Sequence, residues 1–285
     1  MDTRWVDAAS RRMPRVTARI AAAAMLAPGR RMRVRPGQRE TMTRAARETL
    51  IVGRHRVAVY RWGTGERRML LVHGWQGRAA QFAEVVSRFE ESATIVAFDA
   101  PAHGGSRGIT ADIGMWIQTI RALDAQFDFD VVVAHSFGGL AALRARLAGL
   151  VRAQVVAISA PPSTGAVMHA YATQVGLTDA VASRVNEALA RRLGPVMASI
   201  AMGSRADAPA GASQILVIHD RADRAVPVVA ARTIESTWPD AATLMLTDGL
   251  GHNRILAAPP VLDAIASFAA DASHADASAQ AVPAA

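Results

Sequence analysis

Residues 131–139 read VVVAHSFGG, and they are the strongest indication of structure in the chain. The apolar residues 131–134 predict a buried strand, and the residues beyond Ser136 predict the start of a helix. A sharp strand-to-helix turn strains the backbone at its apex and pushes the apical side chain out above the sheet. Its neighbours two positions away must be small, as Ala134 and Gly138 are. The stretch predicts a nucleophilic Ser136, although an ordinary turn would also fit it.

Short apolar runs alternate with longer segments of helical period from about residue 50 onward. Several runs are apolar at every position, as strands buried on both faces are. The alternation is typical of βαβ units, so the sequence predicts an α/β fold with a mainly parallel central sheet flanked by helices. The strands are predicted at residues 57–62, 69–73, 94–98, 131–134, 154–159, 215–219 and 243–247, and the helices at 79–89, 111–127 (after Thr110 as N-cap), 140–150, 226–236 and 261–270.

Three other segments accompany one main domain, which is predicted to span residues 49–270. About fifty residues separate two of the strands, which is too long for a bare loop, and they carry helical patterns. Residues 160–213 are therefore predicted to form a helical cap insertion. Residues 1–48 are predicted to form a basic, partly helical arm, and residues 271–285, which lack any period, a disordered tail.

The positive charge is concentrated in the N-terminal part of the chain. The whole chain has a net charge of +8, and its first 60 residues hold fourteen Arg against four acidic residues. The remainder is near neutral, so the charge does not favour nucleic acid as a partner. A solvated basic extension is the favoured interpretation, and weak contact with an anionic membrane is the alternative.

No segment of the sequence predicts a membrane span or a cysteine-dependent site. The apolar run at residues 20–27, IAAAAMLA, is far shorter than the roughly 20 residues that cross a bilayer, and it predicts a short amphipathic helix. We therefore expect a cytoplasmic protein. The chain has no cysteine, which excludes disulfides, a thiolate nucleophile and Cys-ligated metals.

A hydroxyl nucleophile needs a base and a group that orients the base, and both types of residue follow predicted strands. Residues 220–227, DRADRAVP, come after strand 215–219, and residues 248–253, DGLGHN, come after strand 243–247. The first stretch offers Asp220 and Asp223, and the second offers His252. The carboxyl ends of parallel strands share one edge of a sheet, so the sequence predicts a Ser-His-Asp arrangement there.

These motifs resemble those of the α/β-hydrolase superfamily, within its group of small serine esterases and related hydrolases. The resemblance spans about residues 50–270 and implies the α/β-hydrolase fold. One departure is Ala134, which occupies the place of the first Gly of the usual turn. The matching stretches are 70–77 (LLVHGWQG), 98–106 (FDAPAHGGS), 134–139 (AHSFGG), 219–227 (HDRADRAVP) and 251–252 (GH).

The resemblance implies a role for five positions. Ser136 resembles the nucleophile and His252 the general base, and Asp223 resembles the acid because of its spacing from Val226-Pro227. Asp220 remains the competing acid. The backbone N–H groups of Trp75 and Phe137 resemble the oxyanion-hole donors, and the Trp75 ring is expected either to line an acyl pocket or simply to pack.

The resemblance further implies an esterase that cleaves small-molecule esters through an acyl-enzyme, without metal or cofactor. The alternatives are another Ser-triad activity (thioesterase, lactonase, carbon-carbon hydrolase, acyltransferase or cofactor-free haloperoxidase) or a non-catalytic, membrane-associated scaffold. Asp99 and His103, four positions apart, suggest a metal or second-dyad site, but the Pro and Gly between and after them favour a turn. His135 is expected to be structural.

Overall fold

An eight-stranded sheet forms the centre of the computed structural model, which describes residues 4–193 and 214–279. The strand order is β1-β2-β4-β3-β5-β6-β7-β8. The pairs β1–β2 and β2–β4 are antiparallel, and every pair from β4–β3 to β7–β8 is parallel. The predicted α/β-hydrolase architecture is confirmed. The strands are β1 (Ala46–Val52), β2 (His55–Trp62), β3 (Arg67–Val72), β4 (Ala93–Asp99), β5 (Val131–His135), β6 (Gln154–Ile158), β7 (Ile215–Asp220) and β8 (Ala242–Thr247).

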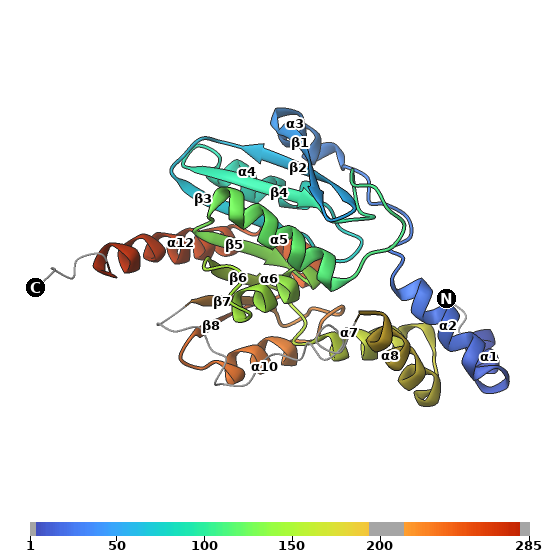
Figure 1. The fold of residues 1–285 in the computed structure, drawn as a ribbon. Coiled ribbons are helices and arrows are strands. Elements are labelled where there is room, and N and C mark those ends of the chain that lie inside the picture. The colour runs from blue at the N-terminus through green and yellow to red at the C-terminus, as the bar shows by residue number, and fades with distance from the viewer. Residues whose placement is uncertain (1–3, 194–213, 280–285) are drawn as a thin grey trace, which may run out of the picture.

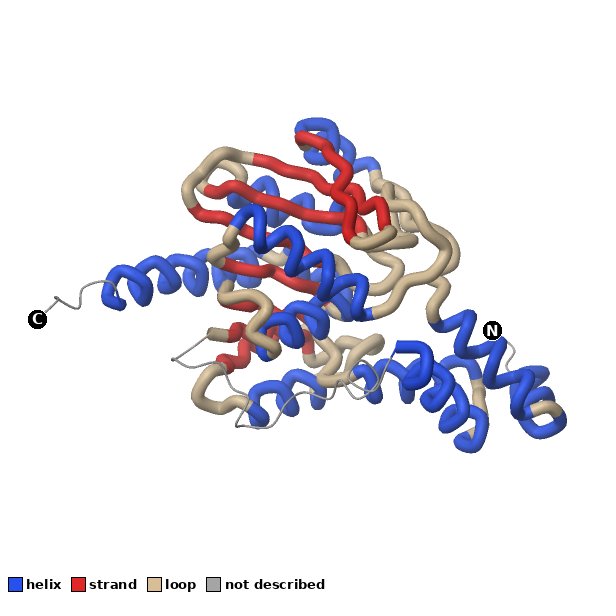
Figure 2. Tube along the Cα trace, viewed as in Figure 1, coloured by secondary structure: helices blue, strands red, loops and turns tan. Residues whose placement is uncertain are grey.

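Helices cover both faces of the sheet (Figures 1 and 2). One face packs against α5 (Ile113–Phe127), α6 (Phe137–Leu147) and α10 (Val229–Thr237). The other packs against η2 (Ala79–Phe82), α4 (Ala83–Phe89), η4 (Ile255–Ala257) and α12 (Pro259–Ala279). Strands β5 and β6 are buried at every position, which explains why their sequences are continuously apolar rather than alternating.

Most differences from the sequence prediction are shifts of a few residues at element ends, and three differences have a clear local reason. Strand β1 was not predicted, because as an edge strand it exposes most of its residues and lacks an apolar pattern. Helix α5 begins after Asp112, whose carboxylate accepts the N–H of Met115, rather than after Thr110. The tail prediction is corrected in part: α12 continues through residues 271–279, as the high helix propensity of its alanines allows, and residues 280–285 lie outside the described residues.

The predicted cap contains α7 (Thr164–Val175) and α8 (Asp179–Leu193), while its residues 194–213 lie outside the described ranges. The N-terminal arm forms α1 (Arg4–Arg12) and α2 (Pro14–Met25). Its apolar contacts correct the expectation of a solvated extension, because one face of α2 is buried against α8. This cluster contains Ala18, Ala21, Ala22, Leu26, Val181, Val185 and Leu189.

Residues 26–32 connect α2 to the rest of the molecule by running along loops at the carboxyl edge of the sheet. The carbonyl of Leu26 accepts the N–H of Ala111 at 2.8 Å, and the carbonyl of Pro28 accepts Nε2 of Gln76 at 3.0 Å. The carbonyl of Met32 accepts a guanidinium N–H of Arg78 at 3.0 Å. Within 4–193 and 214–279 no helix has the length and apolar character needed to cross a bilayer.

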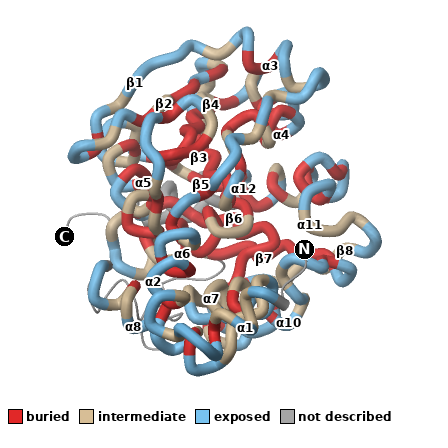
Figure 3. The backbone as a smooth tube through the Cα atoms, turned by 90° about the vertical axis from the view of Figure 1, so that its right-hand side faces the viewer, coloured by how far each residue is buried: buried red, intermediate tan, exposed pale blue. Residues whose placement is uncertain are grey.

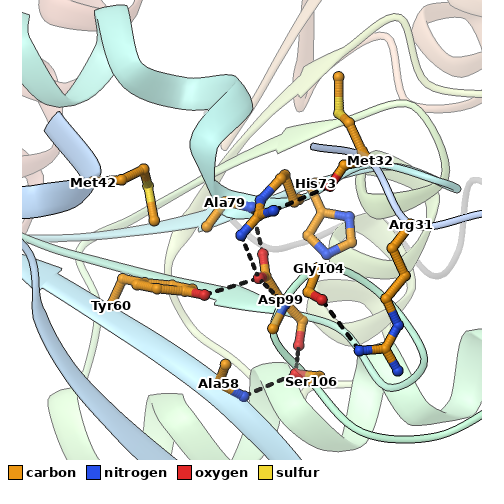
Figure 4. A network of polar contacts seen from close by, with 12 residues as sticks. Arg31, Met32, Met42, Ala58, Tyr60, His73, Ala79, Asp99, Gly104 and Ser106 are labelled. Carbon is orange, nitrogen blue, oxygen red and sulfur yellow. Dashed lines mark hydrogen bonds and ion pairs between the residues drawn. The ribbon is translucent and has the colours of Figure 1, made fainter. Parts of the chain in front are cut away.

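Asp99, at the end of β4, is fully buried and organises the loops around it (Figure 4). Its Oδ2 accepts the hydroxyl of Tyr60 at 2.9 Å and the N–H of Gly105 at 2.6 Å. Its Oδ1 accepts the N–H of Ala79 at 2.7 Å, and Arg78 forms an ion pair with Oδ2 at 3.5 Å. The carboxylate thereby ties loop 73–79 to loop 99–106.

Two buried histidines link the same loops, and neither forms a dyad with Asp99. Nε2 of His73 accepts the N–H of Ala100 at 2.9 Å, and Nε2 of His103 accepts the N–H of Gln76 at 3.0 Å. Burial lowers the pKa of His73, and burial together with neighbouring His73 lowers that of His103 to about 3. Both rings are therefore neutral, and they hold the two loops together through these hydrogen bonds. Among the described residues no group of three or more potential metal ligands gathers.

The Asp99 network should contribute measurably to stability. Burial and the nearby Asp99 carboxylate raise the pKa of Tyr60 to about 12, so its hydroxyl keeps its proton and donates at every ordinary pH. Tyr60→Phe removes a hydrogen bond to a buried charge and should lower the free energy of unfolding by about 1.5 to 3 kcal/mol. Urea denaturation measures the change.

The matched control is Tyr171→Phe, which removes the hydrogen bond from the half-buried Tyr171 hydroxyl to the neutral carbonyl of Ala21. It should lower the free energy of unfolding by about 0.5 to 1.5 kcal/mol. Equal losses in the two variants would mean that the Asp99 carboxylate does not strengthen its hydrogen bond.

Candidate active site

Ser136 occupies the sharp turn between β5 and α6. Its backbone has φ 53° and ψ −124°, a region that a residue with a side chain rarely adopts. The N–H of Ser136 donates to the carbonyl of Ile158 at 2.8 Å, which ties the turn to β6. The turn thus holds the hydroxyl of Ser136 above the carboxyl edge of the sheet, as the sequence predicts.

Glycine is required at three positions around this turn. A Cβ on Gly74 would lie 2.8 Å from Cβ of Ser136, and a Cβ on Gly138 would lie 2.4 Å from the carbonyl oxygen of His73. A Cβ on Gly139 would lie 2.8 Å from Cβ of Ala160. Loop 73–79, the Ser136 turn and the strand end near Ala160 therefore approach each other more closely than side chains would permit.

His252 lies on α11 (Gly251–Arg254), which follows the loop after β8. Its Nε2 is 3.1 Å from Oγ of Ser136, and its Nδ1 is 2.7 Å from Oδ2 of Asp223. Gly249 and Gly251 in the preceding loop have φ of 77° and 65°, which lets the chain reverse direction and return the imidazole to the Ser136 turn. Because Asp223 is an acceptor, Nδ1 carries the proton and Nε2 faces the hydroxyl as an acceptor.

Asp223 is held in one orientation by its own loop, which follows β7. Its Oδ1 accepts the N–H groups of Ala225 at 2.8 Å and Val226 at 2.9 Å, while Oδ2 faces His252. Burial alone would raise the pKa of Asp223, but the hydrogen bonds from His252 and these two N–H groups outweigh it and lower the pKa to about 2. The carboxylate is therefore charged wherever the protein is assayed.

Asp220, the competing acid, has different partners. Its Oδ1 accepts the N–H of Ala222 at 2.9 Å, and its Oδ2 accepts the Thr247 hydroxyl at 2.8 Å and the N–H of Leu250 at 2.9 Å. Burial would raise its pKa, yet these hydrogen bonds lower it overall. Asp220 fastens the loop that carries His252, and the structure brings Asp223, not Asp220, to the imidazole.

Trp75 and Phe137 flank Ser136, one from loop 73–79 and the other from the start of α6. Trp75 follows Gly74, which touches Ser136, and Phe137 is the first residue of α6. Their rings meet edge to face, with centroids 5.6 Å apart, and the Trp75 ring also stacks on Trp116 at 5.9 Å. The Trp75 ring thus packs against its aromatic neighbours, and its role in an acyl pocket stays a prediction. The N–H of Phe137 also lies at a helix N-terminus, where a negative charge is favoured.

Sequence reasoning did not find the contact that His135 makes. Nε2 of His135 donates to the backbone carbonyl of His252 at 2.8 Å, and the two rings lie 4.7 Å apart. Burial and the neighbouring His252 lower the pKa of His135 to about 3, so the ring is neutral. His135 thus holds the His252 backbone in place. Only the position of His135 beside Ser136 could have suggested this, because its partner is 117 positions away.

Asp223, His252 and Ser136 form a continuous chain of contacts from carboxylate to imidazole to hydroxyl. Such a chain lets the imidazole accept the hydroxyl proton while the carboxylate stabilises the resulting positive charge. An activated serine of this kind attacks electrophilic acyl carbon or phosphorus atoms. The arrangement requires no metal ion for this step.

The sequence profile of the Alpha/beta hydrolase family matches residues 69–279. A putative lipase from Acinetobacter baumannii has a similar structure, with 13% identity, a TM-score of 0.61 and coverage of 86% of this chain and 99% of that one. A bromoperoxidase from Bacillus anthracis has 18% identity, a TM-score of 0.59 and coverage of 78% and 99%. Est1E from Butyrivibrio proteoclasticus, with ferulic acid bound, has 17% identity, a TM-score of 0.59 and the same coverage. No curated protein matches the chain in sequence.

The two acids should differ in their effect on the reactivity of Ser136. Asp223→Asn should slow labelling of Ser136 by a fluorophosphonate probe by up to ~10⁴, because the amide favours the wrong imidazole tautomer. Asp220→Asn should slow labelling by about tenfold or less and should mainly lower the free energy of unfolding. Labelling rates from mass spectrometry and urea denaturation of both variants provide the comparison. A larger loss of labelling in Asp220→Asn would reverse the assignment.

Proposed function

We propose that this chain, which belongs to the Alpha/beta hydrolase family, cleaves carboxylic esters of small molecules through an acyl-enzyme on Ser136. The observation that carries the proposal is the continuous contact from Asp223 through His252 to Ser136, with distances of 2.7 Å and 3.1 Å. Members of this family are generally hydrolytic enzymes. The finer assignment to esters rests on the activated serine and on the esterase-like motifs of the sequence.

In the first half of the reaction, Oγ of Ser136 attacks the acyl carbon while Nε2 of His252 accepts the hydroxyl proton. The negative charge of Asp223 stabilises the imidazolium that forms. The carbonyl oxygen becomes an oxyanion, and the N–H groups of Trp75 and Phe137 are proposed to bind it. Each such donor typically contributes about 10² to 10³ in turnover. His252 then gives its proton to the departing alkoxide, which leaves as the alcohol.

In the second half, water takes the place of the alcohol. Nε2 of His252 accepts a proton from the water, whose oxygen attacks the acyl carbon of the ester formed with Ser136. Collapse of the second oxyanion breaks the bond to Oγ, and the imidazolium returns the proton to Ser136. The products are one carboxylic acid and one alcohol for each water consumed. All proton transfers pass through a single imidazole.

The neighbouring histidines are not competing bases in this scheme. His135 is neutral but uses its Nε2–H for the carbonyl of His252. His219 makes a similar contact from its Nε2 to the carbonyl of Val226 at 2.9 Å, which braces the loop of Asp223. His252 is the imidazole that faces Oγ of Ser136.

Ser136→Ala should abolish both fluorophosphonate labelling and ester hydrolysis, because it removes the attacking oxygen. Hydrolysis is measured with p-nitrophenyl esters of several acyl lengths, and labelling by mass spectrometry of the intact protein. Ser159→Ala is a suitable control, because Ser159 is a fully buried serine at the end of the neighbouring strand β6. This variant should keep its labelling and most of its activity.

Labelling that persists in Ser136→Ala would identify a different nucleophile. Labelling of the wild type without turnover of any p-nitrophenyl ester would retain the activated serine but contradict ester cleavage. Thioesters, lactones and 1,3-diketones would then be the next substrates to test.

The rate of ester hydrolysis should rise with pH as one proton leaves His252, and then remain level to about pH 9. The pKa of Asp223 is lowered to about 2, and those of His135 and His103 to about 3, so these groups keep one protonation state above about pH 5. A rise with unit slope is the expected result, because one imidazole carries every proton transfer. A rate that falls as pH rises would remove His252 from the role of base.

Stability must be followed in the same samples. The pKa values of His135 and His103 are lower in the folded protein than the ordinary 6.5. Between 6.5 and about 3 the unfolded chain binds more protons than the folded protein, so the free energy of unfolding decreases as pH falls through that window. The depressed pKa of Asp223 stabilises the fold above 3.8, and this contribution is lost as pH falls through about 2. Circular dichroism at each pH separates loss of folded protein from protonation of the base.

A further inference from the structure

Helix α2 exposes two of its larger apolar side chains, Val16 and Ile20, whereas Met25 packs inward. Its inward face buries Ala18, Ala21 and Ala22 against α8. Met13, which precedes the helix, and Val16 and Ile20 are 55%, 51% and 64% exposed. These three are spaced by three and four residues, so they lie along one side of the helix. A helix that served only to cover the cap would bury its larger apolar residues and expose its alanines.

Arginines run beside this apolar row. Arg15 and Arg19 are exposed and four positions apart, so they lie along the adjacent side of α2, and Arg12, the last residue of α1, is exposed just before that helix. The acidic residue of α1 and α2 is Asp7, which pairs with Arg11 at 3.1 Å. The two rows together form what we call the outer face: Met13, Val16 and Ile20 with Arg12, Arg15 and Arg19. Trp5 on α1, a residue type favoured at membrane interfaces, is also 65% exposed.

We propose that the outer face binds the surface of an anionic membrane. An anionic membrane surface has apolar acyl chains beneath negatively charged headgroups. The apolar row would enter the boundary of the acyl chains, while the arginines would contact the lipid phosphates. The alanine packing fixes α2 to α8, so the outer face exists on the folded protein before any lipid is bound. Figure 3 shows α1 and α2 with exposed segments beside the cap helices.

Two other partners fit less well. A second copy of the chain would bring identical rows of arginines together in a symmetric contact, where like charges repel. A nucleic acid would pair with the arginines but would leave Val16 and Ile20 in water, so it gives no account of the apolar row. The anionic membrane accounts for both rows.

Helix α2 is also connected to the loops beside the candidate active site. Helix α2 leads directly into residues 26–32, and within that segment Pro28 accepts a hydrogen bond from Gln76, the neighbour of Trp75. The binding surface and the site are therefore joined by a short, hydrogen-bonded segment (Figure 1). The proposal does not depend on esterase activity, since binding is measured without a substrate.

The test is co-sedimentation of the full chain with vesicles of phosphatidylcholine alone and of phosphatidylcholine with one third phosphatidylglycerol. Binding should require the anionic lipid and should weaken between about 0.05 M and 0.5 M salt. Replacing Arg12, Arg15 and Arg19 by Gln together should weaken binding roughly 100-fold, at about fivefold for each arginine. Val16→Ser combined with Ile20→Ser should weaken it about tenfold or more. Deleting the whole arm is a poorer test, because it also removes the contacts of residues 26–32.

Matched controls carry the same chemical changes elsewhere on the surface. Arg54→Gln, Arg152→Gln and Arg232→Gln in one protein change the net charge equally, and Ile109→Ser replaces an isoleucine that is 85% exposed. Both controls should bind vesicles within about twofold of wild type. Hydrolysis of a soluble ester and circular dichroism should be unchanged in every variant, since none of these residues contacts the site.

Four results would overturn the proposal. They are absence of binding to anionic vesicles, equal binding to both vesicle types, binding that survives the triple arginine change, and loss of binding in the control set to the same degree. Binding of a DNA duplex that is lost with the arginines but not with the Val16 and Ile20 changes would identify a nucleic acid partner instead. Light scattering that shows a dimer disrupted by the same changes would identify a second copy.

Discussion

The close approach of three backbone segments at Ser136 is the constraint on which the rest of the structure depends. The turn is strained at Ser136, and Gly74, Gly138 and Gly139 leave no room for a Cβ. Such strain of about 1 to 3 kcal/mol persists only where the surroundings fix it. Here the surroundings are a continuous parallel sheet, buried on both faces, whose strand ends bring the three segments together. The sheet supplies the rigidity, and the glycines allow the close approach at which the hydroxyl of Ser136 meets the imidazole of His252.

Two kinds of support keep this site in place. Around Ser136 the buried Asp99 carboxylate ties loop 73–79 to the sheet, and neutral His73 and His103 complete the link. Around the imidazole, Asp220 fastens the loop before His252, and His135 holds the His252 backbone. Most of these supports are buried polar groups that are fixed in one protonation state across ordinary pH.

The sequence predicted those features of the structure that depend on residues close together in the chain. Continuous apolar runs predicted the buried strands, and motif spacing selected Asp223 over Asp220, in agreement with the contacts of His252. Edge strand β1 was not predicted, because most of its residues face solvent and it therefore needs no apolar pattern. The packing of α2 on α8 was not predicted for another reason. Alanines such as Ala18, Ala21 and Ala22 are also common in exposed helices, and their partners in α8 lie far along the chain. The contact of His135 is of the same long-range kind.

The packing of α2 on α8 also has a consequence for the order in which the protein is made. Val181 lies 163 positions after Ala18, so at the usual ~5 to 20 residues per second the ribosome reaches it roughly 10 to 30 s later. During that interval α2 has neither its inward partner nor a finished sheet to lie against, and its alanines and larger apolar residues are all open to solvent. Helix α2 therefore reaches its packed position only after α8 has been made, although it precedes α8 by more than 150 positions in the chain.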